Sequence, residues 1–323
     1  MAYSEAVLRR AQTRLAQAKA DHESESSARV EAIYNQHPRL REIDRSMRRS
    51  VAQAVAVAFR KGMDTTAAIE AIKEENLALQ REREWILEAN DLDESALEPT
   101  PICPHCGGSG YVGAVMCECL RELCRQEQKK ELSSLLAGKE TFETFRLDYY
   151  PTETDPNMGV SPRQLMQVNL RHCKTYAAEF SLRSPSLLFS GGPGLGKTFL
   201  SACIARAVAD NGFSVVYDTA SRLFSDFETA KFGGDRTDLT KKYLECDLLI
   251  IDDLGTEMTT QFTQSVLYQV INTRMMESRP TIISTNLTDA GIKQRYSQAI
   301  ASRLLGAYHA FWFLGKDIRQ LQR

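Results

Sequence analysis

Hydrophobic and polar residues follow two different patterns along the chain, and the pattern changes near residue 160. Before that point, long charged and Ala-rich stretches place apolar residues at helical spacing. After it, helical stretches alternate with short aliphatic or β-branched runs. This alternation predicts a parallel sheet with crossover helices. The expected strands are residues 186–190, 213–219, 247–252, 281–286 and 309–314.

Three helices are predicted within residues 1–98. The second covers residues 41–62 and ends at Gly62, and Asp64 or Thr65 is placed to cap the third. Large apolar residues are scarce here, so this region has little to bury on its own. We therefore expect a helical hairpin that packs against something else.

Composition and charge exclude several classes of protein. The net charge is −2, so a nucleic-acid contact would need a local basic patch. The charged run at residues 39–49 is interpreted as a solvated helix face. The N-terminus has no apolar signal region, and no window is long and apolar enough for a membrane span, so a cytoplasmic protein is expected.

The stretch "GGPGLGKT" at residues 191–198 carries the most specific chemistry. It follows an expected strand, precedes an expected helix and fits the pattern of a phosphate-binding loop. Glycines let backbone N–H groups surround phosphate oxygens, and the lysine and threonine serve the phosphates and Mg²⁺. The residues expected to bind the nucleotide are Gly191, Gly192, Gly194, Gly196, Lys197, Thr198 and Phe199.

A second acidic strand, "LLIIDDLG", supplies the expected partners of this loop. Asp252 suits the Mg²⁺-facing carboxylate, together with Thr198, and Asp253 is placed to orient or deprotonate the attacking water. Glu257 is an alternative base because its side chain reaches further. Asn286, at the end of the next expected strand, is either a γ-phosphate sensor or a helix cap.

The segment after Asn286 is predicted to continue as a helix, with Thr288 as its N-cap. Its apolar residues recur at helical spacing and are expected on one buried face. These residues are Ile292, Tyr296, Ile300 and Leu304.

Four cysteines in two pairs, within residues 103–119, predict a metal site. Cysteines in a reducing compartment are poor disulfide candidates, and thiolates at this spacing bind Zn²⁺ tetrahedrally. A structural site is expected because protein ligands would fill all four positions. The ligands are Cys103, Cys106, Cys117 and Cys119, and Cys124 or His105 could replace one of them.

Residues 221–245 mix aromatic and basic side chains, a combination that suits stacking on bases and contact with phosphates. The phenylalanines are interpreted as core residues, and the role of the basic residues is left open. The residues concerned are Phe224, Phe227, Phe232, Lys231, Arg236, Lys241 and Lys242.

These motifs together resemble the AAA+ ATPases of the bacterial DnaC/DnaI helicase-loader family, which are related to the IstB transposition ATPases. The resemblance rests on "LLFSGGPGLGKTFLS", "CDLLIIDDLGTE", "TIISTNL", "RYSQAIASRLLG" and "GKDIRQLQR", with "TFETFRLDYYP" before them and the cysteine stretch further upstream. It implies that Asn286 is a sensor residue and that Arg303 is an arginine finger offered to a neighbouring subunit.

The fold implied is an α/β P-loop AAA+ sheet with flanking helices and no C-terminal lid, preceded by a helical module with a zinc knuckle. Without a lid, the only nearby substitute for the sensor arginine is Arg319, so a weak ATPase in isolation is expected. The predicted division is a partner-binding module, a zinc knuckle, a linker and an AAA+ domain, at residues 1–98, 99–125, 126–160 and 161–323.

The function implied is ATP-dependent loading of a DnaB-type hexameric replicative helicase onto single-stranded DNA. ATP or ADP, Mg²⁺ and Zn²⁺ are the expected cofactors, and self-association through the AAA+ domain is expected. Two alternatives stay open: an IstB-like transposition accessory ATPase, and a nucleotide-gated binding protein with negligible turnover.

Overall fold

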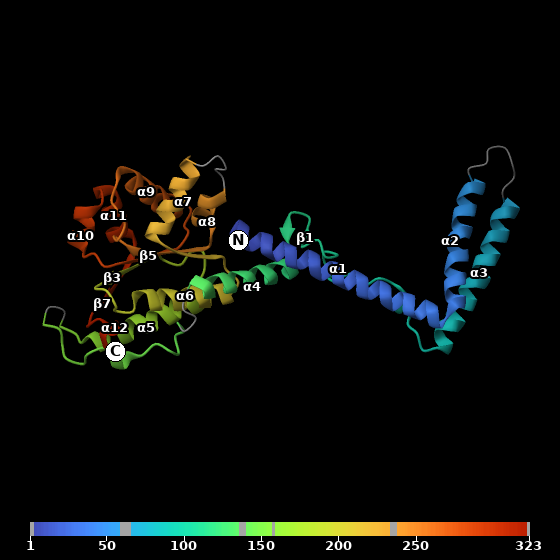
Figure 1. Cartoon of the computed structure of the whole chain (residues 1–323), viewed down its shortest axis with the longest axis horizontal. Helices are drawn as coiled ribbons and strands as arrows, with labels where there is room; N and C mark the ends of the chain where they lie inside the picture. The colour runs from blue at the N-terminus through green and yellow to red at the C-terminus, as the bar shows by residue number, and fades with distance from the viewer. Residues whose placement is uncertain (1–2, 59–65, 136–139, 157–158, 233–237, 322–323) are drawn as a thin grey trace. The chain divides into compact units, whose positions relative to one another are not determined.

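The computed structural model describes residues 3–58, 66–135, 140–156, 159–232 and 238–321. Its contacts divide the chain into two compact units, shown in Figure 1. The sheet unit comprises residues 1–12 and 118–323, and the helical unit comprises residues 13–117. Each unit is described by itself.

The sheet unit contains a five-stranded parallel sheet with strand order β4-β5-β6-β3-β7. Every strand predicted from the sequence is present within two residues of its expected bounds, because short runs of apolar residues buried on both faces are typical of parallel strands. The strands are β3 (Leu187–Gly191), β4 (Val215–Thr219), β5 (Leu248–Leu254), β6 (Thr281–Thr285) and β7 (His309–Phe313).

Helices cover both faces of this sheet, as the α/β prediction requires (Figure 1). Along β5, Leu248 and Ile250 join one core and Leu249 and Ile251 the other, because successive side chains point to opposite faces. The first face carries α4 (Glu118–Leu135), α5 (Pro162–Ala178) and α6 (Lys197–Asp210). The second carries α7 (Ala220–Phe232), α8 (Asp238–Glu245), α9 (Gln261–Met276), α10 (Asp289–Arg295) and α11 (Gln298–Ala307).

Two short helices lie close to the loop that follows β3. They are η2 (Leu147–Tyr149) and α12 (Ile318–Leu321). The N–H of Ile318 donates to the carbonyl of Gly194 at 3.0 Å. The hydroxyl of Tyr150, directly after η2, donates to the carbonyl of Leu195 at 2.9 Å. Both contacts therefore brace the same loop from segments far away in the sequence.

The single helix expected after Asn286 is two helices in the structure. Thr288 caps α10 as predicted, but α10 ends at Arg295, and Ser297 caps α11 by accepting from the N–H of Ile300. The four apolar residues predicted for one face are all buried nonetheless. The prediction of one continuous helix is therefore wrong, because Ser297 caps a second helix.

The first residues of the chain belong to the sheet unit. Helix α1 (Glu5–Gln36) begins there, and the hydroxyl of Tyr3 donates to the carbonyl of Gly212 at 3.3 Å. Arg10 forms ion pairs with Glu127 and Glu131 of α4. These bounds differ from the division into domains predicted from the sequence, and that division stays a prediction.

The helical unit holds the rest of α1, an antiparallel pair of helices and a small hairpin. Among its described residues, one apolar core consists of Leu40, Ile43, Ile86, Leu87 and Leu97 with a few partly buried neighbours. Gly62, Asp64 and Thr65 lie outside the described residues. Its other elements are α2 (Pro38–Ala58), α3 (Thr66–Ala89), η1 (Glu94–Leu97), β1 (Tyr111–Val112) and β2 (Val115–Met116).

The charged run at residues 39–49 forms a solvated face, as interpreted from the sequence. Arg39 pairs with Glu42 and Glu82, and Arg41 pairs with Glu31. In the part of the chain that the structure describes, no helix combines the length and the apolar character that a membrane crossing requires.

Candidate functional site

The loop between β3 and α6 has a backbone that demands glycine. Gly194 and Gly196 have φ values of 70° and 90°, which L side chains rarely adopt. A Cβ on Gly194 would lie 1.7 Å from Asp317 Oδ1, and one on Gly196 would lie 2.7 Å from the Tyr150 hydroxyl. The glycines of the predicted phosphate loop are therefore fixed by conformation and by close neighbours.

Lys197, at the start of α6, is held with its charged end inside the loop. The side chain is buried, and Nζ donates to the carbonyls of Gly191 and Gly192 and to Asn286 Oδ1, each at 2.7 Å. Burial lowers the pKa of Lys197 to about 8, against the opposing attraction of Asp253 and Asp252. Neutral acceptors hold this buried cation, so an anion in the loop would stabilise it.

Asp252, at the end of β5, is buried and accepts hydrogen bonds at both carboxylate oxygens. Thr198 Oγ1 donates to Oδ1 at 3.3 Å, and the hydroxyl of Ser284 donates to the same oxygen. The hydroxyl of Tyr217 donates to Oδ2 at 2.8 Å. The structure thus brings the predicted Mg²⁺ partners Thr198 and Asp252 together.

Sequence reasoning did not identify Tyr217 or Ser284. The signal that could have found them is strand alternation, since both lie on the sheet face to which Asp252 points. Their positions also depend on the order of the strands, which the sequence pattern leaves open.

Asp253 adopts a left-handed backbone conformation with φ of 55° and lines the cavity beside the loop. Its N–H donates to Ser284 Oγ at 2.9 Å. Burial and the neighbouring Asp252 raise the pKa of Asp253 above its usual value. A carboxylate with a raised pKa next to a phosphate loop is well placed to accept a proton from water.

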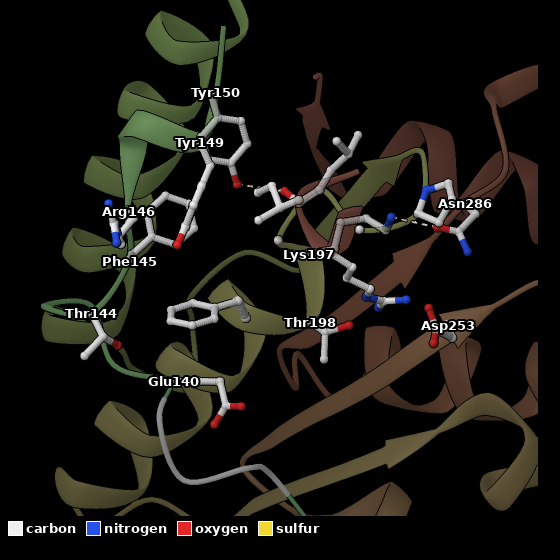
Figure 2. A pocket seen from close by; sticks show the side chains of 17 residues that line it. Glu140, Thr144, Phe145, Arg146, Tyr149, Tyr150, Lys197, Thr198, Asp253 and Asn286 are labelled. Atoms are coloured by element: carbon white, nitrogen blue, oxygen red, sulfur yellow. Dashed lines mark hydrogen bonds between the residues drawn. The ribbon is translucent and has the colours of Figure 1, made fainter. Parts of the chain in front are cut away.

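A cavity of about 420 Å³ opens in front of this loop (Figure 2). Figure 2 shows Phe145 and Tyr149 on one side and Asp253 and Asn286 on the other. Phe145 lies 5.6 Å from Phe199, ring centre to ring centre, so one wall is aromatic. Six further residues line the cavity: Glu140, Thr144, Arg146, Tyr150, Ile318 and Arg319.

The aromatic wall comes from a segment within the predicted linker, residues 126–160. Its aromatic residues stand in "TFETFRLDYYP", but only the tertiary structure places Phe145 beside Phe199 and Tyr149 in the lining of the same cavity. An apolar wall next to a cationic loop suits a ligand with a flat base at one end and phosphates at the other.

Glu257 and Arg303 lie outside the described lining of this cavity. The Glu257 carboxylate is buried and accepts from the N–H of Gly255 at 2.8 Å and from the hydroxyl of Tyr296. These contacts hold the carboxylate in the loop after β5, whereas Asp253 lines the cavity.

Arg303, on α11, is held by α9. Its guanidinium donates to Asn272 Oδ1 at 2.8 Å and to the Tyr268 hydroxyl at 3.0 Å, and it stacks on the Tyr268 ring. An arginine placed away from the cavity of its own chain is compatible with a role toward a neighbouring subunit.

The four predicted zinc ligands form one cluster. The sulfur atoms of Cys103, Cys106, Cys117 and Cys119 all lie within 4.8 Å of one another. Tetrahedral Zn–S bonds would place sulfur atoms about 3.8 Å apart, and Cys103 and Cys117 are 3.8 Å apart. These residues therefore fit a zinc ion.

The two alternative ligands are not part of this cluster. His105 is exposed. Cys124 is buried within α4, where burial raises the pKa of its thiol to about 11. Of the three candidates for the fourth zinc ligand, Cys119 is the one that lies in the cluster.

The structure confirms only part of the interpretation of residues 221–245, in which the phenylalanines are core residues. Phe224 and Phe227 are buried, whereas Phe232 is 75% exposed, so the core interpretation is wrong for Phe232. Lys242 forms ion pairs with Asp218 and Asp226. Lys231 lies over the Phe232 and Phe262 rings, and Arg236 lies outside the described residues.

Comparison with protein families matches residues 157–311 to the IstB-like ATP binding proteins. This segment, just under half of the chain, is similar to those ATP binding proteins. It contains the loop, both aspartates, Asn286 and Arg303. The resemblance that the sequence motifs predicted is thereby confirmed.

The relatives of this domain include replication proteins. The replicative helicase loader DnaC of Buchnera aphidicola (subsp. Baizongia pistaciae) is 29% identical over 135 residues, 41% of this chain and 54% of that protein. DnaC of Escherichia coli K12 is 29% identical over 119 residues, 36% of this chain and 49% of that protein. This chain thus spans about half of the length of these relatives.

Among solved structures, the DnaC helicase loader gives a TM-score of 0.47 at 19% identity, over 54% of this chain and 97% of that chain.

Proposed function

We propose that this protein is an ATP-dependent loader of a replicative DNA helicase and that its IstB-like domain hydrolyses ATP. The main support for a nucleotide site is that Lys197, Thr198 and Asp252 lie together at a loop whose conformation requires glycine. The helicase-loading role rests on the relatives named above.

Each residue of the site has a role in this proposal. Lys197 exchanges its carbonyl partners for phosphate oxygens, and the loop N–H groups and the start of α6 add further donors. Thr198 and Asp252 would hold Mg²⁺, which neutralises developing charge on the phosphates when bound. Asp253 orients or deprotonates the water, and Asn286 holds the reacting phosphate region.

Arg303 would complete the site of an adjacent subunit. An arginine finger contributes about 10³–10⁵ to turnover, so the isolated subunit is expected to be a weak ATPase. Self-association through this domain, contact with single-stranded DNA and binding of a DnaB-type hexameric helicase belong to the same proposal. Residues 1–98 are the part proposed to bind the helicase.

The zinc cluster is proposed as a structural site. All four positions would be taken by thiolates, which leaves no position for a reacting water. Metal binding would add stability to this part of the chain, because the binding free energy is coupled to folding.

The experiment that tests the nucleotide site compares two variants. Lys197→Ala should abolish binding of ATP and ADP in calorimetry, because the phosphates lose their buried cation. Asp253→Asn should still bind ATP but show no turnover in the presence of helicase and single-stranded DNA. Lys293→Ala, at an exposed lysine on α10, is the matched control and should behave like the unmodified protein. Retained hydrolysis in both site variants would refute the assignment.

An IstB-like transposition accessory ATPase is the second candidate, favoured by the family match itself. Affinity capture from the native host distinguishes the two, since a loader recovers a hexameric helicase and an accessory ATPase recovers a transposase. Turnover that stays negligible with helicase and single-stranded DNA would instead favour a nucleotide-gated binding protein.

A further inference from the structure

Tyr217 is a buried tyrosine whose hydroxyl is bonded to the Mg²⁺-facing carboxylate. The phenol oxygen lies 2.8 Å from Asp252 Oδ2 and 3.3 Å from Ser201 Oγ, one turn into the helix that begins at Lys197. A phenol carries its proton at neutral pH, so the Tyr217 hydroxyl donates to the carboxylate.

The strand register explains why β4 supplies this group. Thr219 pairs with Asp252, and Tyr217 pairs with Ile250. Tyr217 and Asp252 are thus diagonal neighbours on adjacent strands, and alternation places both on the face that α6 covers. A long side chain such as tyrosine is able to bridge this diagonal spacing.

The other oxygen of the carboxylate has a separate set of partners. Oδ1 of Asp252 accepts from the hydroxyls of Thr198 and Ser284. Ser284 Oγ accepts from the N–H of Asp253, so its own hydrogen remains for Asp252. Because different strands hold the two oxygens, rotation of the carboxylate would break at least one hydrogen bond to a buried charged group, which is costly.

We propose that Tyr217 is a positioning residue for metal binding: its hydroxyl holds Asp252 Oδ2 so that Oδ1 stays beside Thr198, where the cation of a bound nucleotide would be held. This inference rests on the proposed nucleotide site. Groups that orient a metal ligand in this way typically contribute about 10–100-fold to metal affinity.

The test measures two quantities separately: nucleotide affinity without a metal ion, and the Mg²⁺ concentration that changes this affinity. A fluorescent ATP analogue is titrated into the full-length protein without divalent cation, and Mg²⁺ is then added to find the midpoint of its effect. In Tyr217→Phe, the affinity without metal should be unchanged, and the Mg²⁺ midpoint should rise about 10–100-fold. A structural role alone would lower the melting temperature and leave this midpoint in place.

Tyr243→Phe is the matched control. Tyr243 is also buried in the sheet unit, and its hydroxyl lies within hydrogen-bond distance of two carboxylates on the opposite face of the sheet, Asp218 at 2.9 Å and Asp226 at 2.7 Å. This variant should lose stability without any change in the Mg²⁺ midpoint. Equal midpoints in the Tyr217→Phe variant and the unmodified protein, or equal shifts in both tyrosine variants, would overturn the inference.

A double variant covers the case in which Tyr217→Phe is too unstable to assay. Asp252→Asn removes the buried charge that would be left without a partner, so Tyr217→Phe in that background is expected to fold. The tyrosine substitution should then have no further effect on the Mg²⁺ midpoint, since no carboxylate remains to be positioned. A further shift contradicts the inference, whereas an unmodified protein that binds no nucleotide would instead contradict the proposed function.

Discussion

The sheet unit and the helical unit organise their apolar residues in contrasting ways. In β5, Leu249, Ile250 and Ile251 are each at most 1% exposed, because helices cover both sheet faces. In the helical unit, Val51 and Trp85 are 60% and 68% exposed. Some large apolar side chains of the sheet unit, such as Met258 and Met276, are exposed as well. The contrast between the units therefore lies in the two helix-covered cores that enclose the sheet.

This difference bears on where the proposed chemistry is located. The nucleotide site needs side chains fixed in place, and it is built on strands and a helix that pack into the two large cores. In the described part of the helical unit, the apolar core comprises five buried residues, and ion pairs lie on the surface. Four experiments would break or sharpen this comparison, from the largest expected effect to the smallest.

Removal of zinc should have the largest effect, confined to the cysteine cluster. Structural zinc supplies about 10–16 kcal/mol of apparent binding free energy in small sites, and this energy is coupled to folding. Treatment with a chelator should abolish hydrogen-exchange protection in residues 103–119 while strands β3 to β7 stay protected. Hydrogen exchange with mass spectrometry measures both regions in one sample.

Cysteine variants provide the control for that experiment. Cys119→Ser should lower the zinc content of the purified protein, measured by atomic emission. Cys124→Ser should leave it unchanged, since the Cys124 thiol lies outside the cluster. Zinc loss in the Cys124 variant alone would assign the fourth ligand differently.

Truncation of a core residue should destabilise the sheet unit more than the helical unit. Ile250 and Leu40 are both fully buried, and such truncations cost about 2–5 kcal/mol. Ile250→Ala should lie at the upper end of that range, because sheet and helices enclose the cavity it leaves. Leu40→Ala should lie at the lower end, because a small helical core collapses more easily.

Urea unfolding in single-tryptophan backgrounds measures each unit separately. Trp312 reports on the sheet unit and Trp85 on the helical unit, and the chain has two tryptophans. Equal losses of unfolding free energy in Ile250→Ala and Leu40→Ala would mean that the two cores respond alike to truncation.

The pH dependence of nucleotide binding should have an intermediate effect. The Lys197 amine has its pKa lowered to about 8 by burial, and bound phosphates favour its charged form. Binding therefore takes up a proton above about pH 8, and affinity should fall by up to about tenfold per further pH unit. It should be nearly constant at lower pH, until the phosphates themselves titrate.

Lys197→Arg is the control for this pH profile, because a guanidinium stays charged throughout. Its affinity, measured by calorimetry across the same range, should lack the decline above pH 8. A decline of the same size in the arginine variant would show that another group titrates.

The smallest effect is expected at a surface ion pair of the helical unit. The pKa of the Arg39 guanidinium is raised by its hydrogen bonds to Glu82 and Glu42, but all three side chains are solvent-exposed. Exposed pairs contribute little because water and salt screen them. Arg39→Ala should leave the Trp85-detected urea midpoint unchanged, and a clear shift would mean that these ion pairs support the unit.

Several features of this protein follow from the sequence alone, because they depend on residues near one another in the chain. The five strands are apolar runs, the loop at residues 191–198 follows one of them, and the four cysteines fall within 17 residues. Local patterning sets such elements through backbone propensity and short loops. Thr288 as a helix cap belongs to the same class.

Only the tertiary structure decided the features that join distant parts of the chain. Tyr217 and Ser284 reach Asp252 because β5 lies between β4 and β6. Phe145 forms an aromatic wall because its segment packs beside Phe199. Strand order and packing set these contacts, and the pattern of residues along the sequence determines neither the strand order nor the packing.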